Sequence, residues 1–448
     1  MRRSLCCAIA TILCGFCAVP AAQAAKRTTV PGELKRLRAA GALTPEDAAA
    51  RRTVYDEAKA KVKKLTGTRR LELGGVVSDL DGIAARGQLT ASRVPALFET
   101  LQRNLAYWPA QPLLKSGARL SFPGSELVYQ LYPGHGLQIQ WLATFGKLNG
   151  YWSGGRRYGT RASALLDEAI ALASARAGGL AWEYLFPFDG QSPPWVSSLA
   201  QGTGLQAMAR AATRLQRQEE VFPIAAKGLT IFQTAPPQGV RVPLDGGAHY
   251  LQYSGLPKTF IINGFVQSLV GLYDFAALTG DATARSLFDA GDVAARVEVP
   301  TFDTGAWSLY SRGSGSSESD LGYHTLLRDF LVQLCRRTAV VQYCSASQHF
   351  TAYLKTPPVL QVLPRTLRPR KTGKLRFKLS KISRVGVRIS RDGQLVGTLN
   401  PGTLGRGTKS LSWTPPKKTG TYTVTVNATD LAGNAASAAG EVEVAKRP

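Results

Sequence analysis

The sequence is poor in the residues that most often bind metals and cofactors. It has 4 histidines and 6 cysteines among 448 residues, and four of those cysteines stand within the first 24 positions. No Cys or His pair near the other two, Cys335 and Cys344, has the spacing of zinc ligands. No glycine-rich phosphate loop precedes a predicted helix either. We therefore expect no zinc site, no nucleotide and no other cofactor.

Long apolar segments are also lacking, apart from one at the start of the chain. Arg2 and Arg3, an apolar stretch over 5–19 and Ala-Gln-Ala at 22–24 are typical of a secretory signal over 1–24. No later stretch reaches the roughly 18 apolar residues of a membrane span. We expect a soluble protein that is secreted, extracellular or at the cell surface. In an oxidising compartment a disulfide between Cys335 and Cys344 is favoured, and two unrelated buried thiols are the alternative.

Acidic residues are scarce, and the excess of basic ones is uneven. The net charge of the chain is +25. Residues 357–448 carry 17 Lys and Arg against 4 Asp and Glu, whereas 111–356 carry 20 against 17. This distribution favours a polyanion or an acidic surface as the partner, namely an acidic polysaccharide or the cell envelope. No nucleic-acid-binding motif accompanies the charge, so we expect no nucleic acid partner. A solvated basic surface without a specific partner is the alternative.

Apolar periodicity divides the chain after the signal into three regions. Residues 25–118 read as a charged helical region, and a loosely alternating, extended piece follows over 119–129. The region 119–355 then contains eight helical patterns, which indicate four antiparallel pairs and thus an α/α toroid with a pocket at one end. A solenoid would produce the same pattern. The predicted helices are 136–150, 160–177, 195–216, 219–235, 258–279, 282–298, 320–338 and 345–354.

The pattern changes to short alternating strands near residue 357. A turn at 391–393 (RDG) and a strand at 422–428 (YTVTVNA) are typical of antiparallel sheets. We interpret 357–446 as an Ig-like β-sandwich, similar to the accessory modules of many secreted bacterial enzymes. The chain is thus predicted to be mainly α with a β module, and a protease-sensitive hinge is expected at 356–358.

Three tyrosines in the helical region stand beside recognisable motifs. Tyr253 and Tyr323 precede apolar helical runs, and Tyr310 lies between them. The motifs are 195–202 (WVSSLAQG), 260–265 (FIINGF), 271–274 (GLYD), 302–305 (FDTG) and 323–324 (YH). In their order and spacing they resemble the C-terminal catalytic domain of the D-glucuronyl C5-epimerases over about 151–353.

The resemblance implies inversion of the carbon next to a sugar carboxylate within a polysaccharide, without a cofactor. Removal of the C5 proton creates an enolate-like dianion, so cations or hydrogen-bond donors must neutralise the carboxyl group. Inversion also needs a proton-transfer group on each face of the ring. The resemblance places Tyr253, Tyr310 and Tyr323 in the active site. We expect Tyr253 and Tyr323 on opposite faces and Tyr310 in substrate orientation or proton relay.

Further residues are candidates for substrate binding. Arg312 can hold a carboxylate bidentately, and His324 could do the same or orient Tyr323. The family commonly has a glutamate where this chain has Gln252, which cannot accept a proton. Glu183 and Glu318 are the acidic residues that could replace it from other loops. Three more candidates, with burial or capping as the alternative, are Trp195, Gln201 and Asn263.

The sequence therefore predicts a secreted uronate C5-epimerase acting on an acidic polysaccharide. A polysaccharide lyase is one alternative, since it shares the first proton abstraction. A glycoside hydrolase is less favoured because no pair of facing carboxylates stands out. A non-catalytic glycan-binding protein is the other alternative, for which Gln252 is the main argument. The resemblance to the animal enzymes is compatible with a homodimer.

Overall fold

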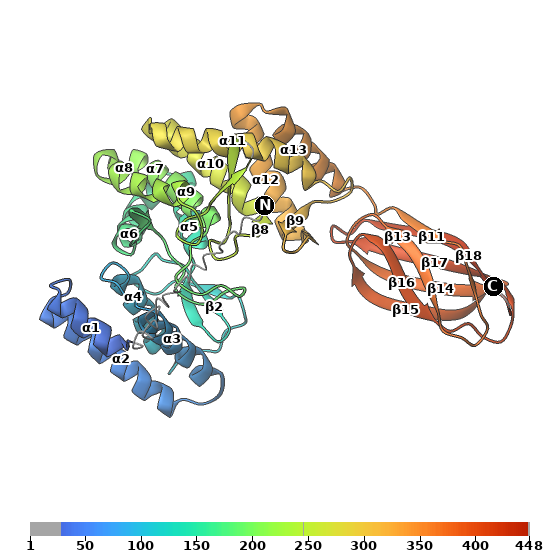
Figure 1. The fold of residues 1–448 in the computed structure, drawn as a ribbon, viewed down its shortest axis with the longest axis horizontal. Coiled ribbons are helices and arrows are strands. Elements are labelled where there is room, and N and C mark those ends of the chain that lie inside the picture. The colour runs from blue at the N-terminus through green and yellow to red at the C-terminus, as the bar shows by residue number, and fades with distance from the viewer. Residues whose placement is uncertain (1–27, 245, 447–448) are drawn as a thin grey trace, which may run out of the picture.

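The computed structural model describes residues 28–244 and 246–446 of the chain. The predicted signal at 1–24 lies outside these residues. The described chain forms a helical part and a β-sandwich at its side (Figure 1). Short β-hairpins lie between some of the helices. None of the helices in the described ranges is long and apolar enough to cross a membrane.

Four helices open the described chain and surround a small apolar core of their own. Threonine side chains cap the first two, since Thr29 Oγ1 accepts from Gly32 N at 3.2 Å and Thr44 Oγ1 accepts from Asp47 N at 3.0 Å. A proline in the first turn of each fits this position, where no intrahelical N–H bond is lost. The helices are α1 (Val30–Ala39), α2 (Pro45–Lys64), α3 (Gly67–Ala85) and α4 (Val94–Tyr107).

A three-stranded antiparallel sheet follows and packs against α3 and α4. The carboxylate of Glu72 holds its second hairpin, since Oε2 accepts from the N–H groups of Gly134 and Gly136 at 2.9 and 3.0 Å. The sequence indicates only a loose extended piece here, because each strand has two to four residues. The strands are β1 (Arg119–Leu120), β2 (Tyr129–Tyr132) and β3 (Gly136–Ile139).

Eight long helices form four antiparallel pairs, as the periodicity indicates. Each pair contributes one helix to an inner row, in which α5, α7, α10 and α12 are successive neighbours. The second helix of each pair, α6, α8, α11 or α13, covers this row from outside (Figure 1). The helices are α5 (Trp141–Gly154), α6 (Gly159–Ala171), α7 (Ser198–Leu215), α8 (Gln218–Ala226), α10 (Ile262–Thr279), α11 (Ala282–Thr301), α12 (Leu321–Thr338) and α13 (Val341–Tyr353).

The two central helices of the inner row approach each other at glycines. A Cβ at Gly271 of α10 would lie 2.1 Å from the carbonyl oxygen of Gly202 in α7. A Cβ at Gly202 would in turn lie 2.7 Å from the Cα of Ser268. Only glycine permits this backbone approach. The motifs that contain Gly202 and Gly271 in the sequence therefore have a packing function.

Short strands and helical turns interrupt several segments that the periodicity assigns to helices. The predicted helices 136–150, 160–177 and 258–279 each include a strand, and 219–235 is divided into α8 and two shorter turns. The sheet with the order β10-β9-β8 carries Tyr310 on its central strand. These elements are η1 (Arg156–Tyr158), β4 (Ser174–Arg176), β5 (Gly179–Ala181), η2 (Lys227–Leu229), α9 (Thr230–Gln233), β6 (Arg241–Leu244), β7 (Gly247–Tyr250), β8 (Thr259–Ile261), β9 (Leu309–Gly313) and β10 (Ser317–Glu318).

The C-terminal part is a sandwich of two sheets around a separate apolar core. One sheet has the order β11-β13-β16 and the other β12-β18-β17-β14-β15, in which β12 runs parallel to β18. Buried and exposed residues alternate along β13 and β17, as the sequence predicts. The strands are β11 (Leu360–Leu363), β12 (Arg365–Leu367), β13 (Gly373–Leu379), β14 (Ser383–Arg391), β15 (Gln394–Leu404), β16 (Gly407–Trp413), β17 (Gly420–Asp430) and β18 (Ala435–Val444).

The structure contains the disulfide that the sequence favours. It joins Cys335 near the end of α12 to Cys344 in the first turn of α13, with the two Cα atoms 4.9 Å apart. The last helical pair is therefore closed by a covalent bond at the turn between its helices.

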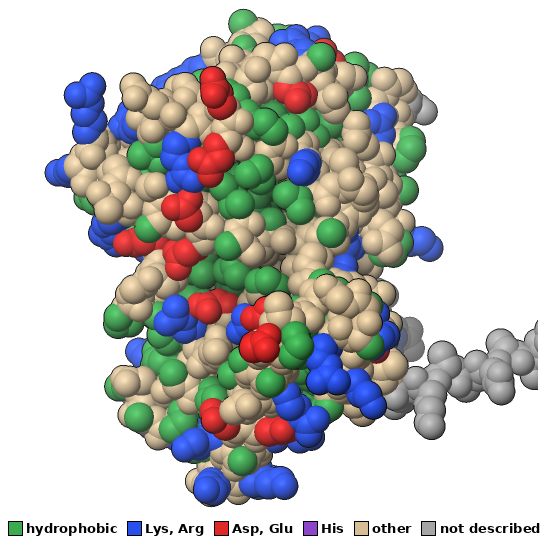
Figure 2. Space-filling model, turned by 90° about the vertical axis from the view of Figure 1, so that its left-hand side faces the viewer, with side chains coloured by type: hydrophobic (Ala, Val, Ile, Leu, Met, Phe, Trp, Pro, Cys, Tyr) green, Lys and Arg blue, Asp and Glu red, His purple; other side chains and the backbone are tan. Residues whose placement is uncertain are grey.

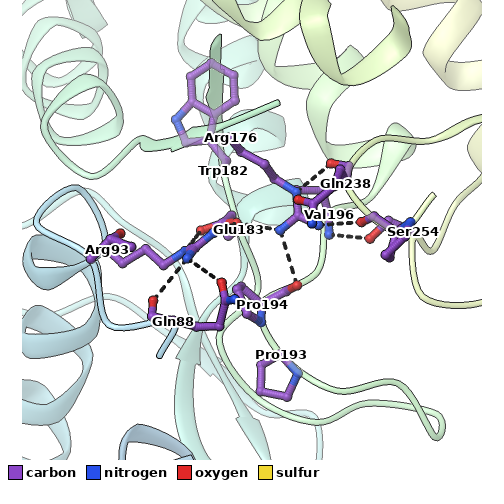
Figure 3. A network of polar contacts seen from close by, with 12 residues as sticks. Gln88, Arg93, Arg176, Trp182, Glu183, Pro193, Pro194, Val196, Gln238 and Ser254 are labelled. Atoms are coloured by element: carbon purple, nitrogen blue, oxygen red, sulfur yellow. Dashed lines mark hydrogen bonds and ion pairs between the residues drawn. The ribbon is translucent and has the colours of Figure 1, made fainter. Parts of the chain in front are cut away.

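A buried carboxylate connects the N-terminal helices to the helical pairs (Figure 3). Glu183 is fully buried, and both of its oxygens bind arginines. Arg93 at the start of α4 donates from Nε at 2.6 Å and from Nη2 at 3.0 Å, and Arg176 at the end of β4 donates from Nη1 at 2.6 Å. Carbonyl oxygens of Gln88 and Gln238 accept further guanidinium hydrogens. Glu183 therefore has a structural role and is not free to replace a catalytic glutamate.

Removal of this carboxylate should destabilise the fold strongly. We expect Glu183→Gln to lower the free energy of unfolding by about 3–5 kcal/mol, because two buried guanidinium groups lose their counter-ion. Urea unfolding followed by circular dichroism measures the change. Glu57→Gln, at an exposed position of α2, is the control and should change the free energy by less than about 0.5 kcal/mol. Equal effects of the two substitutions would contradict the structural role of Glu183 and its two arginines.

Candidate active site

A cavity of about 450 Å³ lies where the inner helices begin. Gln140 and Ser197 cap the N-termini of α5 and α7, and both line the cavity together with Tyr323 from the first turn of α12. Gln252 lies against the first turn of α10, because a Cβ at Gly264 would be 2.7 Å from its Cβ. The N-terminal ends of four helices therefore surround one cavity. Such ends carry partial positive charge and favour an anionic ligand.

Aromatic side chains form much of the cavity wall. Trp195 stacks on Tyr184 with ring centroids 4.2 Å apart and planes at 12°, and its Nε1 donates to the carbonyl oxygen of Phe186. The Gln140 amide joins two tyrosines: its Nε2 donates to the Tyr132 hydroxyl at 3.1 Å, and its Oε1 accepts from the Tyr184 hydroxyl at 3.2 Å. The residues lining the cavity are Arg119, Gln130, Tyr132, Gln140, Leu142, Tyr184, Phe188, Trp195, Ser197, Leu199, Gln252, Tyr253, Tyr323 and Leu326.

The structure brings together the three tyrosines that the sequence singles out. The rings of Tyr310 and Tyr323 lie 4.7 Å apart between centroids, inclined at 44°. The ring of Tyr253 packs edge-on against Trp195 at 5.5 Å. Tyr253 and Tyr323 line the cavity, whereas Tyr310 on β9 forms no part of its wall. Tyr310 is thus placed to act through the other two.

Burial and mutual proximity shift the acidity of two of these phenols. Burial raises the pKa of Tyr253 well above the ordinary value near 10, and the Gln252 amide opposes this only in part. Burial also raises the pKa of Tyr310, and the neighbouring Tyr253 and Tyr323 raise it further. Both hydroxyls are therefore protonated at neutral pH and available as donors. Tyr323 is 40% exposed and reaches water.

Gln252 has an unused hydrogen-bonding atom beside these hydroxyls. Its side chain is 5% exposed, and its Oε1 accepts no hydrogen bond from any residue that the structure describes. A buried amide oxygen without a donor is costly, so a ligand hydroxyl in the cavity would be a favourable partner. Glu318 does not stand in for the missing carboxylate here, because it binds backbone N–H groups of Ile382 and Arg406.

The cation at the cavity is Arg119, and the sequence analysis did not identify it. Its Nε donates to Gln130 at 2.7 Å, which leaves further guanidinium hydrogens for a ligand. Arg312, the predicted carboxylate-binding residue, does not line the cavity. Its guanidinium lies over the ring of Phe302, 5.8 Å from the centroid, and its side chain is exposed.

Three other predicted site residues lie in the protein interior. His324 is fully buried and stacks on Trp307 at 3.7 Å, with its ring nitrogens bound to Ser308 and to the carbonyl oxygen of Phe350. Gln201 binds the backbone of Trp182 through both ends of its amide. Asn263 Nδ2 donates to the carbonyl oxygen of Tyr323 at 2.9 Å. His324 and Asn263 therefore fix the position of Tyr323 rather than contact a ligand.

Several cavity residues escaped the sequence analysis because they come from other parts of the chain. Arg119, Gln130 and Tyr132 belong to the β1–β2 hairpin, which precedes every motif of the resemblance. The weak alternation over 119–129 includes Arg119 but ends before Gln130 and Tyr132. Among the residues that the structure describes, no group of three His, Cys, Asp or Glu side chains is placed to hold a metal ion.

The fold and the cavity define a protein of paired helices with an aromatic pocket that contains one arginine and is lined from several helix N-termini. Residues 178–351 match the family described as D-glucuronyl C5-epimerase C-terminus, in agreement with the resemblance of the motifs. A D-glucuronyl C5-epimerase of Caenorhabditis elegans is 34% identical over 131 residues. The match covers 26% of this chain and spans about a fifth (21%) of that relative's length.

Solved structures of sugar epimerases also align with this chain. A sugar epimerase from a ruminal bacterium has 9% identity and a TM-score of 0.40, over 63% of this chain and 72% of that one. Cellobiose 2-epimerase from Bacillus thermoamylovorans has 10% identity and a TM-score of 0.39, over 82% and 83% of the two chains.

The buried histidine should make stability depend on pH. Burial lowers the pKa of His324 from 6.5 to about 4, so the unfolded chain binds a proton more readily than the folded one between these values. Stability is therefore lost as pH falls through this window. We expect a loss of roughly 3 kcal/mol from His324 between pH 7 and pH 4. Urea unfolding at both pH values measures it.

A substitution separates this contribution from that of the carboxylates. His324→Phe retains an aromatic ring against Trp307 but does not titrate. The variant should be less stable at pH 7, because Ser308 loses its partner, and its stability should fall less between pH 7 and pH 4. An identical pH dependence in the two proteins would show that His324 is not held neutral.

Proposed function

We propose that this protein inverts C5 of hexuronic acid residues in an acidic polysaccharide. The observation that carries the proposal is that Tyr253 and Tyr323 line a cavity surrounded by four helix N-termini, with Tyr310 in contact with Tyr323. The family of residues 178–351 supports carbohydrate epimerisation as the type of reaction. The cavity accounts for an acidic substrate, because Arg119 and the helix ends would stabilise its carboxylate.

The same groups stabilise the charge that develops during the reaction. Abstraction of the C5 proton places a second negative charge on the carboxyl group, and preorganised donors near it lower the barrier. Trp195 is 4% exposed and stacks with both Tyr184 and Phe188, so it shapes the cavity wall and offers no free face to a sugar ring. The free Oε1 of Gln252 would accept a hydrogen bond from a sugar hydroxyl. Arg119 and Gln252 would thus set the position of the substrate.

The different environments of the tyrosines suggest separate roles. Tyr323 is the most exposed of the three and can exchange its proton with water, so we assign it as the base that takes the C5 proton. Tyr253 is more buried and protonated, and we assign it as the acid on the opposite face. After turnover Tyr323 holds the proton that Tyr253 has lost. Tyr310 contacts Tyr323 and adjoins Tyr253, so it can return that proton.

Deuterium incorporation tests this function directly. We expect the protein, incubated in deuterated water with uronate polysaccharides, to place deuterium at C5, as measured by NMR. Tyr253→Phe and Tyr323→Phe should each lower the rate by about 10²–10⁴-fold, because each removes a proton-transfer group. Tyr158→Phe is the matched control, since Tyr158 stacks on Tyr151 at 5.2 Å and does not line the cavity.

The products distinguish epimerisation from the alternatives. Intact polymer length with deuterium at C5 supports an epimerase. New ultraviolet absorbance from an unsaturated uronate, with shortened chains, would instead show a lyase. Binding of the polysaccharide without exchange at C5 would show a glycan-binding protein and exclude the proposed reaction.

We further propose that the protein is exported and that its sandwich is an Ig-like accessory module binding polyanions. The signal-like first 24 residues support export, and the placement of β12 beside β18, opposite β11, supports an Ig-like order. Basic and acidic side chains are interspersed on the face of the helical part in Figure 2. A recess of about 630 Å³ in the sandwich is instead lined mainly by cations: Arg368, Lys371, Lys417, Lys418 and Lys446.

Salt dependence tests the role of this basic recess. Lys417→Gln with Lys418→Gln should weaken binding to the acidic polysaccharide and reduce its dependence on salt, because fewer cations face the polymer. The rate on a short uronate oligosaccharide should stay unchanged, since the recess lies at the end of the sandwich marked C in Figure 1. Lys63→Gln with Lys64→Gln, two exposed lysines of α2, is the control. Equal loss of binding in both double variants would contradict a specific basic site.

A further inference from the structure

The end of α13 is held by side chains of the sandwich. Lys381, in the turn between β13 and β14, donates from Nζ to the carbonyl oxygens of Tyr353 at 2.8 Å and of Thr356. Asn434, in the turn between β17 and β18, donates from Nδ2 to the carbonyl oxygen of Leu354 at 2.9 Å. The last carbonyls of a helix have no intrahelical donors, so these contacts complete α13 from the neighbouring domain.

Lys381 belongs to a buried ion pair at this junction. Its side chain is 1% exposed, and that of its partner Asp430 is fully buried at 2.5 Å. Burial alone would raise the pKa of Asp430, but Lys381 and Asn434 lower it below its usual value. A paired lysine with two carbonyl acceptors is fully satisfied only while the sandwich stays docked. The expected hinge at 356–358 therefore contains a fixed carbonyl.

The same lysine contacts the group of residues that supports Tyr323. Its Nζ lies 5.2 Å from the centroid of the Trp307 ring, which is fully buried and stacks on His324. Trp307 Nε1 donates to the carbonyl oxygen of Ser319 at 2.8 Å, next to Asp320, whose side chain caps α12 at Tyr323 N. The ion pair of the sandwich is thus two side chains away from a cavity tyrosine.

A second contact holds the hairpin that carries Tyr310. Glu318 on β10 accepts from the backbone N–H groups of Ile382 at 2.9 Å and Arg406 at 2.6 Å, both in the sandwich. Its register partner on β9 is Leu309, the residue before Tyr310. One carboxylate therefore uses both oxygens to attach the β9–β10 hairpin to two different turns of the sandwich.

We propose that the sandwich is a positioning element of the active site, and that Glu318 and Lys381 are the residues through which it holds Tyr310 and Tyr323. Glu318 fixes the hairpin from one side, and Lys381 supports Trp307 and His324 from the other. The roles of the two tyrosines rest on the proposed function, whereas the docking of the sandwich does not. An accessory module on a free linker would lack both contacts.

Glu318→Gln tests, in the full-length protein, whether Glu318 attaches the β9–β10 hairpin to the sandwich. An amide has one acceptor oxygen in place of two, so one backbone N–H of the sandwich loses its partner. We expect amide hydrogen exchange over 309–318 and 321–326 to become at least tenfold faster, with an unchanged midpoint of global unfolding. We also expect the turnover number for C5 exchange to fall at least tenfold while KM stays within twofold.

The matched control and a second variant make the result decisive. Glu441→Gln removes the same charge at an exposed position of β18 and should leave exchange and turnover unchanged. Lys381→Met combined with Asp430→Asn removes both buried charges together, and the asparagine oxygen still accepts from the N–H groups of Ala432 and Asn434. This double variant should accelerate exchange over 321–326, because the ammonium no longer lies against Trp307.

The outcomes distinguish an error in the proposed attachment to the sandwich from an error in the proposed function. Unchanged amide hydrogen exchange over 309–318 in Glu318→Gln would show that Glu318 does not hold the β9–β10 hairpin. Faster exchange with an unchanged turnover number would overturn the positioning role. A wild-type protein that is inactive on every polysaccharide, with exchange altered in the variants as expected, would overturn the proposed function and leave the docked sandwich established.

Discussion

The buried carboxylate of Glu183 is the constraint on which the cavity depends. Its two arginines come from the N-terminal helices and from the β4–β5 hairpin, so one group joins parts of the chain that are 90 residues apart. The residues on either side of it reach into the helical pairs. Trp182 binds Gln201 of α7, and Tyr184 stacks on Trp195 in the cavity wall. Because the buried charge of Glu183 must remain paired, it fixes the position of Tyr184 and thereby of Trp195 in the cavity wall.

The opposite side of the cavity depends on contacts made from the sandwich. Tyr323 is held by the cap of α12, by Asn263 through its carbonyl oxygen, and by the stack of His324 on Trp307. Lys381 and Glu318 attach this assembly to the sandwich. The helical part therefore supplies the anionic-ligand environment through its helix ends, while the sandwich supports the hairpin and helix that carry two of the tyrosines. Binding and positioning are divided between the two parts of the chain.

The site combines a favourable electrostatic environment with unfavourable acidities. Four helix N-termini and Arg119 suit a carboxylate, but burial raises the pKa of Tyr253 and Tyr310, and Gln252 adds no negative charge. A protonated phenol is a competent acid and a poor base. The proposed division of roles follows from the difference in exposure, since Tyr323 is the tyrosine that remains in contact with water. The residues that set the charge and acidity of the site, Arg119, Tyr253 and Tyr310, come from separate elements of the fold.

The sequence by itself determined the helical pairs, the alternating strands, the pairing of Cys335 with Cys344 and the grouping of the three tyrosines, because each leaves a local pattern or a family motif. Only the tertiary structure decided that Arg119 faces the cavity while Arg312 does not, and that His324 and Gln201 are interior. It also decided that Glu183 and Glu318 serve as structural anchors. Charged and polar residues carry no local signal for their partners, since a contact between distant residues exists only after the elements have packed.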